Sequence, residues 1–191
     1  MLERHPPARA RNQAATRNAI LAAARVEFSA RGYDHATVRG IAARAGTDPA
    51  LVIRYFGSKE KLFGEAIAEE FAFDDWFGTD RAQIGRFLAR IVSSKPAGSE
   101  DPFLATLRSA GNPAAVDLIR KRIESTFLDP LGALIGGPEA QERAAEIAAL
   151  ITGVIISRKV LNLGPYATMT EQQLDTSLAR SIQRIVDGAP K

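Results

Sequence analysis

The chain has 191 residues, of which 46% are hydrophobic and 25% charged, a composition ordinary for a globular protein that buries its own core. It contains no cysteine, which excludes structural disulfides, thiol catalysis and cysteine-ligated zinc sites. Residues 1–60 hold 10 Lys and Arg against 5 Asp and Glu, whereas residues 61–191 hold 15 against 17. This basic first third indicates a segment that binds a polyanion, or a chance cluster of solvated charge.

The N-terminal part predicts a flexible arm followed by a helix. Residues 1–15 carry two prolines and several arginines, and they lack the apolar run of a secretory signal. From Thr16, apolar residues recur at helical spacing. Gly32 is placed to end this helix, since glycine adopts the conformation that follows a helix C-terminus.

Two short helices are predicted next, within twenty residues. Thr37 is placed to cap the first, over 37–45, and a glycine follows its end. Asp48 is placed to cap the second, with Pro49 at its first position, where a missing N–H costs nothing. Two short helices joined by a tight turn predict a helix-turn-helix, whose second helix presents its start to base edges in the major groove.

The rest of the chain predicts helices and no strand, so the expected fold class is all-α. Pro130 is expected to kink or split a helix, and the Gly-Gly-Pro at 136–138 to break the chain. Thr170 and Gln173 have the spacing of a capping box. The longest mostly apolar run, 147–156, is too short for a membrane helix. The helices are expected at about 58–71, 80–93, 102–110, 113–134, 138–162 and 170–187.

The run TVRGIAARAGTDPALVIRYFGSKEKL resembles the N-terminal motif of the tetracycline-repressor (TetR) family of bacterial transcription regulators. The family's usual run is similar to T-V-x-x-I-A-x-x-A-G-V-S-x-x-x-L-Y-x-H-F-x-S-K-E-x-L. The preceding helix, with Phe28, Gly32, Tyr33 and Thr37, also resembles the opening helix of the family. The resemblance covers residues 16–66.

This resemblance implies a three-helix DNA-binding domain over 16–60 and a helical domain over 61–191 that binds a ligand and dimerises, about nine helices in all. It implies a cytoplasmic homodimer that represses transcription and is released from a palindromic operator by a small, largely apolar effector. Thr37 and Lys59 match phosphate-contacting positions of the family. The positions carried over as DNA-binding are Thr37, Arg39, Asp48, Pro49, Ala50, Leu51, Ile53, Arg54, Tyr55 and Lys59.

The recognition helix departs from the family pattern. Ile53 stands where tyrosine is usual, which removes a hydroxyl and offers an apolar contact to a thymine methyl. Thr47 replaces a usual valine, and Asp48 a usual serine; an acid facing DNA lowers affinity unless it stays at the helix cap or accepts from a cytosine amino group. Arg39 and Arg54 have the chemistry to read guanine.

The body of the chain carries two sets of apolar residues that fit either a core or a functional surface. The resemblance implies an apolar ligand cavity, for which the candidates are Phe71, Trp76, Phe87, Phe103, Leu107 and Phe127. It also implies that the last two helices form a four-helix bundle with a second chain, for which the candidates are Ile147, Leu150, Ile151, Val154, Leu174, Leu178 and Ile182. A twofold dimer places its recognition helices about 34–36 Å apart, or a multiple of that, and so predicts a palindromic operator.

Three alternatives to a ligand-released repressor stay open. An architectural DNA-binding protein would show no operator preference, and an orphan regulator would bind another protein and no small molecule. An enzyme is disfavoured, because the sequence has no GxSxG motif, metal-ligand cluster or phosphate-cradling loop. We therefore expect no catalytic residue, no metal site and no cofactor.

Overall fold

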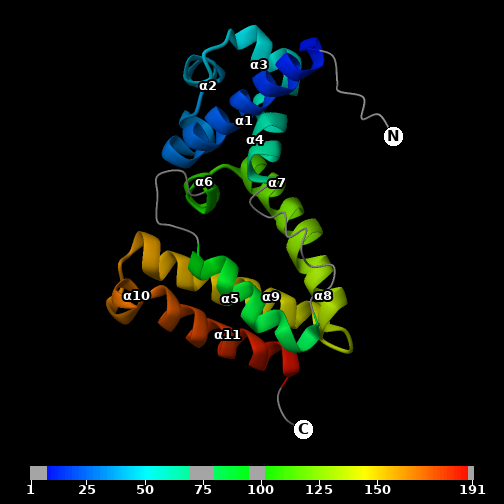
Figure 1. The fold of residues 1–191 in the computed structure, drawn as a ribbon, viewed down its shortest axis with the longest axis vertical. Helices are drawn as coiled ribbons and strands as arrows, with labels where there is room; N and C mark the ends of the chain where they lie inside the picture. The colour runs from blue at the N-terminus through cyan, green and yellow to red at the C-terminus, as the bar shows by residue number, and fades with distance from the viewer. Residues whose placement is uncertain (1–7, 69–79, 95–101, 189–191) are drawn as a thin grey trace. The chain divides into compact units, whose positions relative to one another are not determined.

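The structure, a computed structural model, describes residues 8–68, 80–94 and 102–188 (Figure 1). Over these ranges the regular elements are helices and none is a strand, which confirms the all-α prediction. Contacts divide the chain into two units. We call them the head unit, residues 1–72 and 98–122, and the body unit, residues 73–97 and 123–191.

The units do not divide at residue 60, where the resemblance separates a DNA-binding from a ligand-binding domain. Residues 61–72 and 98–122 belong to the head unit, although they follow the helix-turn-helix in the chain. The functional division at residue 60 stays a prediction, whereas the structural division lies elsewhere.

The head unit is built on the long helix α1, which packs against α2, α4 and α6. Its elements are α1 (Ala8–His35), α2 (Val38–Arg44), α3 (Pro49–Phe56), α4 (Lys59–Ala68), α6 (Pro102–Arg108) and most of α7 (Pro113–Ile123). Apolar residues at helical spacing on these helices face one another and exclude water, which stabilises the unit. The buried side chains of this core include Ile20, Phe28, Ile41, Val52, Phe56, Leu62, Phe63 and Ile67.

Helix α1 begins at Ala8, eight residues before the expected start at Thr16. Residues 8–15, expected to be part of a flexible arm, are therefore helical, and residues 1–7 lie outside the described ranges. Alanine and arginine, which dominate this stretch, are strong helix formers. The helix is interrupted where it was expected to end, at Gly32, which has φ 70° and ψ 176°.

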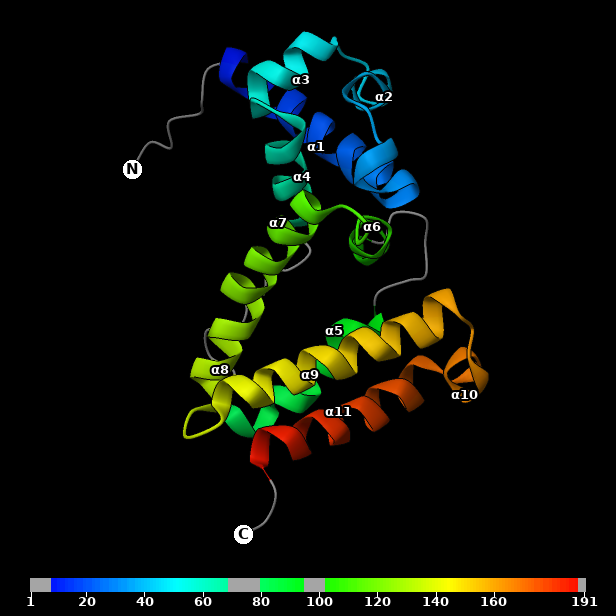
Figure 2. The same cartoon turned by 180° about the vertical axis from the view of Figure 1, so that it is seen from behind.

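The body unit centres on α5 (Ile84–Ser94) and α11 (Glu171–Asp187), which pack side by side, with α9 (Ala140–Ile155) next to α11 (Figure 2). Its remaining elements are η3 (Arg81–Gln83), η4 (Glu124–Leu128), α8 (Asp129–Ile135), η5 (Ile156–Val160) and α10 (Gly164–Thr168). The core of this unit includes Ile84, Leu88, Phe127, Leu131, Ile135, Ile147, Val154, Leu174, Leu178, Ile182 and Val186.

Helices α5 and α11 approach closely at Gly85. Its N–H donates to Oε1 of Gln183 at 3.0 Å. A Cβ at this position would lie 2.4 Å from the carbonyl oxygen of Ala179, so no larger residue fits without separating the helices.

The predicted helix breaks at Pro130 and at the Gly-Gly-Pro are confirmed in the body unit. Pro130 lies in the first turn of α8, directly after the π-helical turn η4, and Gly136 ends α8. The capping box of Thr170 and Gln173 is formed at the start of α11. The helix expected over 138–162 is present as α9, which continues into the π-helical turn η5; Asn162, with a φ of 49°, then turns the chain before the short α10.

Candidate nucleic-acid interface

The turn between α2 and α3 is fixed by local hydrogen bonds. Thr37 caps α2, because its Oγ1 accepts from the N–H of Gly40 at 3.0 Å. The chain then reverses through Gly46, which has a φ of 63°. The N–H of Thr47 donates to the carbonyl of Ala42 at 2.9 Å, which closes the turn. A short, rigid turn of this kind sets the position of α3 relative to α2.

The start of α3 is capped by the acid that replaces the family's serine. Oδ1 of Asp48 accepts from the N–H of Ala50 at 2.7 Å, and Pro49 occupies the first turn. The carboxylate of Asp48 is therefore bound to the helix end, the arrangement in which an acid near DNA is tolerated. Val52 and Phe56 are buried in the head unit and anchor the opposite side of α3.

The exposed side of α3 is formed by residues one helical turn apart. Ala50, Ile53 and Arg54 are exposed, and 43% of Ile53 is accessible to solvent. The guanidinium of Arg54 lies over the ring of Tyr55, 5.6 Å from its centroid. An exposed isoleucine beside an arginine offers a methyl contact and a bidentate donor, the two kinds of group that read thymine and guanine.

All ten sequence-predicted DNA-binding residues lie in the head unit, on α2, α3, their caps and the first residue of α4. Their exposure differs, and their contact with DNA stays a prediction. The exposed ones are Thr37, Arg39, Asp48, Ala50, Ile53 and Arg54, and the half-buried ones are Pro49, Leu51, Tyr55 and Lys59.

At the start of α4, Lys59 lies against Tyr33 of α1, which is not among the ten predicted DNA-binding residues. Oγ of Ser58 accepts from the N–H of Lys61 at 3.2 Å and caps this helix. The Nζ of Lys59 lies 4.5 Å from the centroid of the Tyr33 ring and donates to the carbonyl of Asp34 at 3.4 Å. Two residues of α1, Tyr33 and Asp34, therefore hold the ammonium group of Lys59 beside the first turn of α4.

Tyr33 and Glu60 shift one another's protonation. The hydroxyl of Tyr33 donates to Oε1 of Glu60 at 2.7 Å. This hydrogen bond is the largest cause that lowers the pKa of Glu60 below its usual value. Burial, and then the hydrogen bond to Glu60, raise the pKa of Tyr33. At neutral pH the pair is therefore a neutral phenol bound to a carboxylate.

A buried acid, Glu27 of α1, holds α2 in place. Only 4% of Glu27 is exposed. Nε of Arg31 lies 3.0 Å from its Oε1, and Nε of Arg44 at the end of α2 lies 3.8 Å from its Oε2. Gly40 leaves space for the carboxylate of Glu27, since a Cβ at position 40 would lie 2.9 Å from its Oε1. An acid at an apolar helix position is the sequence signal that could have identified this residue.

The residues expected to line a ligand cavity are divided between the two units, and some lie outside the described ranges. Phe71 and Trp76 lie outside those ranges. Phe127 is buried in the core of the body unit and Phe87 packs against it. Two further candidates lie on α6 of the head unit, where Phe103 is half-buried and 37% of Leu107 is exposed.

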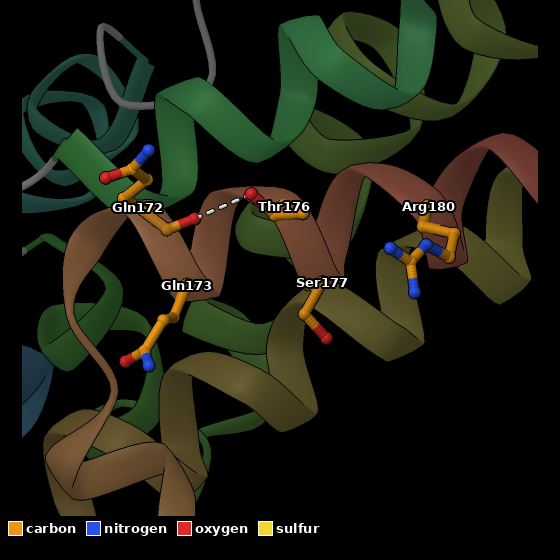
Figure 3. Close-up of a pocket in the computed structure, with 5 residues that line it drawn as sticks. All are labelled: Gln172, Gln173, Thr176, Ser177 and Arg180. Atoms are coloured by element: carbon orange, nitrogen blue, oxygen red, sulfur yellow. Dashed lines mark hydrogen bonds between the residues drawn. The ribbon is translucent and has the colours of Figure 1, made fainter.

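Among the described residues lie two hollows of similar size that are not lined by these candidates. One, of about 410 Å³, lies on the exposed side of α11, where the side chains of Figure 3 project from the helix: Gln172, Gln173, Thr176, Ser177 and Arg180. The other, of about 400 Å³, lies between α1 and the end of α2 and is lined by Ala19, Ala22, Ala23, Arg25, Val26, Arg44 and Ala45. The predicted effector cavity therefore stays a prediction.

Most residues expected at a dimer interface face the core of their own unit. Each is at most 5% exposed, so little of its surface is left for a second chain; they are Ile147, Val154, Leu174, Leu178 and Ile182. Leu150 and Ile151 are half-buried and pack against this core. The apolar stripes of α9 and α11 thus serve the protomer's own core, which was the alternative to the interface.

Among the helices of the described ranges, none has the length and apolar character that crossing a membrane requires. Those same ranges hold no group of three His, Cys, Asp or Glu side chains placed to bind a metal ion.

Comparison with known proteins supports the interpretation of both halves of the chain. A family model described as bacterial regulatory proteins, tetR family, matches residues 20–66, and one described as tetracyclin repressor-like, C-terminal domain, matches residues 83–186. None of the curated proteins matches.

Several solved structures share the fold. A TetR-family regulator from Streptomyces coelicolor is 29% identical, with 98% of this chain and 100% of that chain covered and a TM-score of 0.62. A transcriptional regulator from Rhodococcus sp. Rha1 is 23% identical, with 91% and 99% covered and a TM-score of 0.64. A transcriptional regulator from Saccharomonospora viridis, in complex with choline, is 23% identical, with 87% and 95% covered and a TM-score of 0.63.

Proposed function

We propose a specific function for this chain on the premise that it belongs to the tetracycline-repressor family of transcriptional regulators, as its two family matches establish. The chain acts as a homodimer that binds a palindromic operator and represses transcription until a small molecule releases it. The observation that carries the proposal is the exposed side of α3, where Ala50, Ile53 and Arg54 follow a capped and rigidly connected helix start.

DNA binding divides between residues that position the head and residues that read bases. Thr37 and Lys59, at helix starts, are proposed to contact phosphates, which attract cations and helix N-termini. Arg39 and Arg54 are proposed to read guanine, and Ile53 a thymine methyl. The net charge of +5 over residues 1–60 supports this assignment, because phosphate neutralisation dominates affinity for DNA.

Dimerisation is proposed to use the sides of α9 and α11 that the protomer leaves uncovered. On α9 these include Ala149, Thr152 and Gly153, and within the described part of the chain no atom beyond the helix's own neighbouring backbone lies within 4 Å of a Cβ built at Gly153. Small residues let a second helix approach closely. On α11 the uncovered side carries the polar residues of Figure 3. A twofold axis through this surface would pair two heads on a palindrome.

An effector can release the dimer from DNA only if it binds the conformation of the free dimer more tightly than the conformation that the dimer adopts on DNA. We propose a small, largely apolar effector, in keeping with the family. Choline, present in the structure from Saccharomonospora viridis, is a cation and so lies outside that apolar class, but it is a useful compound to test beside apolar ones, because aromatic side chains such as Phe87 are the class that binds quaternary ammonium groups. A rise in the melting temperature with choline would identify binding, and loss of operator affinity at saturation would identify release.

Selection of binding sites from a random duplex library, with the purified chain at near-physiological salt, tests the proposal. Weak non-specific attraction is suppressed under these conditions. An enriched palindrome is the expected result. Binding without enrichment would instead support an architectural DNA-binding protein. An enriched palindrome from which no candidate effector releases the chain would support an orphan regulator.

A further inference from the structure

The contact between Lys59 and Tyr33 is specific enough to assign a role to both residues. An ammonium group within about 6 Å of an aromatic centroid is attracted by the ring face, and the Nζ of Lys59 is 4.5 Å away. The same group donates to the carbonyl of Asp34. Because an ammonium has three N–H donors, these two contacts leave it a donor for a group outside the protein.

The ring that holds this ammonium is itself fixed from several directions. Only 7% of Tyr33 is exposed. Its ring lies parallel to that of Phe28, with centroids 6.3 Å apart, and meets the ring of Phe63 edge-on at 5.1 Å. Its hydroxyl is bound to Glu60, the residue that follows Lys59. The ring is therefore held in one orientation, and the side chain that rests on it is ordered with it.

The backbone of Tyr33 is hydrogen-bonded to the residue directly after α6, a helix that comes much later in the chain but belongs to the same unit. The N–H of Tyr33 donates to Oγ of Ser109 at 2.9 Å, and Ser109 is fully buried. The guanidinium of Arg108 donates to the carbonyl of Ser29, one turn earlier on α1. Arg108 and Ser109 thus fix by hydrogen bonds the C-terminal end of α1, which carries the Tyr33 ring.

We infer that Tyr33 is a positioning residue for DNA binding, which holds the Lys59 ammonium at the start of α4 so that its remaining donor meets a DNA phosphate, and that Ser109, the residue directly after α6, fixes Tyr33 for this task. The inference rests on the proposed function. A lysine side chain has much rotamer freedom to lose on binding, so ordering it in advance increases affinity. The N–H groups of the first turn of α4 attract the same phosphate.

The test measures how the affinity of the full chain for a mixed-sequence DNA duplex depends on salt. The slope of log affinity against log salt falls by about 0.9 for each phosphate that the protein no longer neutralises. We expect Lys59→Met to reduce the slope by that amount per subunit. Tyr33→Leu, which removes the aromatic face, is expected to reduce it equally, and the double variant no further. Tyr33→Phe keeps the ring and should keep the slope.

Two further variants separate the positioning role of Tyr33 from the general loss of a positive charge or of stability. Lys61→Met removes a charge from the exposed side of the same helix, and a smaller reduction of the slope is expected there. Ser109→Ala frees the backbone of Tyr33 without touching its ring, and a weaker affinity than wild type is expected.

A measurement without DNA covers the case in which Tyr33→Leu fails to fold. In the wild-type chain, the proton resonances of the Lys59 ε-methylene group should be shifted upfield by the ring current of Tyr33. Tyr33→Phe should retain this shift. Unshifted resonances in the wild type would overturn the inference.

The outcomes distinguish this inference from the proposed function. If Lys59→Met reduces the slope and a folded Tyr33→Leu does not, Tyr33 has no positioning role, whereas DNA binding stands. If the wild-type chain binds neither this duplex at low salt nor any duplex in the selection, the proposed function fails, and the phosphate role of Lys59 fails with it.

Discussion

The close approach of α6 to α1 at Gly32 predicts that this glycine cannot be replaced. Gly32 has φ 70° and ψ 176°, a combination that residues with a Cβ essentially never adopt. A Cβ at this position would also lie 2.8 Å from the carbonyl oxygen of Arg108, a backbone atom of α6 that cannot move by itself. Gly46 is the matched control, because its φ is also positive at 63° but no atom lies within 4 Å of an added Cβ.

The two substitutions to alanine both place a Cβ at a positive φ, but only Gly32→Ala also places it against the backbone of another helix. Gly46→Ala introduces backbone strain alone, which costs about 1–2 kcal/mol. Gly32→Ala introduces strain of about 1–3 kcal/mol and an overpacked contact that costs about 1–3 kcal/mol more. We expect Gly32→Ala to lower the free energy of unfolding by at least ~2 kcal/mol, and by more than Gly46→Ala does.

Urea unfolding of the full chain, followed by circular dichroism, measures both free energies. In a thermal scan a loss of 1 kcal/mol lowers the melting temperature of a chain of this size by about 2–4 °C, so Gly32→Ala should melt well below the control. A Gly32→Ala variant as stable as Gly46→Ala would refute the close contact between α1 and α6.

Four further predictions concern single side chains. Thr170→Ala should lower the free energy of unfolding by about 1 kcal/mol, because it removes the capping hydroxyl of α11; no change in urea unfolding would contradict the capping role. Arg143→Met should lower it by about 1–3 kcal/mol, since the guanidinium donates to four backbone carbonyls; an unchanged midpoint would show that water replaces these bonds. Tyr33→Phe should raise the pKa of Glu60 toward its ordinary value, measured by NMR titration, because the hydroxyl favours the carboxylate. Since that pKa is lowered in the folded chain, the stability that the bond contributes is present above the ordinary carboxyl pKa and is lost as the pH falls through the lowered value, so acid should destabilise the wild type more than Tyr33→Phe. Arg54→Ala should cost about 1–3 kcal/mol of discrimination at one operator position; retention of the full base preference in repeated site selection would exclude Arg54 as a reader.

The features that were predictable from the sequence are those that short-range chemistry determines. Thr37, Asp48 and Thr170 were recognised as caps because a side-chain oxygen at a helix start binds an N–H two or three residues later. The break at Gly32 was recognised for a similar reason, since few residues adopt its backbone conformation. These signals do not depend on how distant segments pack.

The features that were missed depend on residues far apart in the chain. Tyr33 and Lys59 are twenty-six positions apart, and no spacing rule connects them. The stripe that includes Leu174 and Ile182 was equally consistent with a core and with an interface, because periodicity shows which side of a helix is apolar and not what covers it. The helix start at Ala8 was missed for a different reason, since residues 8–15 hold no apolar side chain larger than alanine and therefore show no apolar period.

The most direct test of the central claim is the ratio of two affinities at near-physiological salt. One is the affinity of the chain for the duplex enriched by selection, and the other is its affinity for a scrambled duplex of the same length and composition. A sequence-specific regulator is expected to bind the selected duplex more tightly by a factor on the order of 10³ or more, with two chains on each duplex. Equal affinities for the two duplexes would contradict the assignment of this chain as an operator-binding regulator.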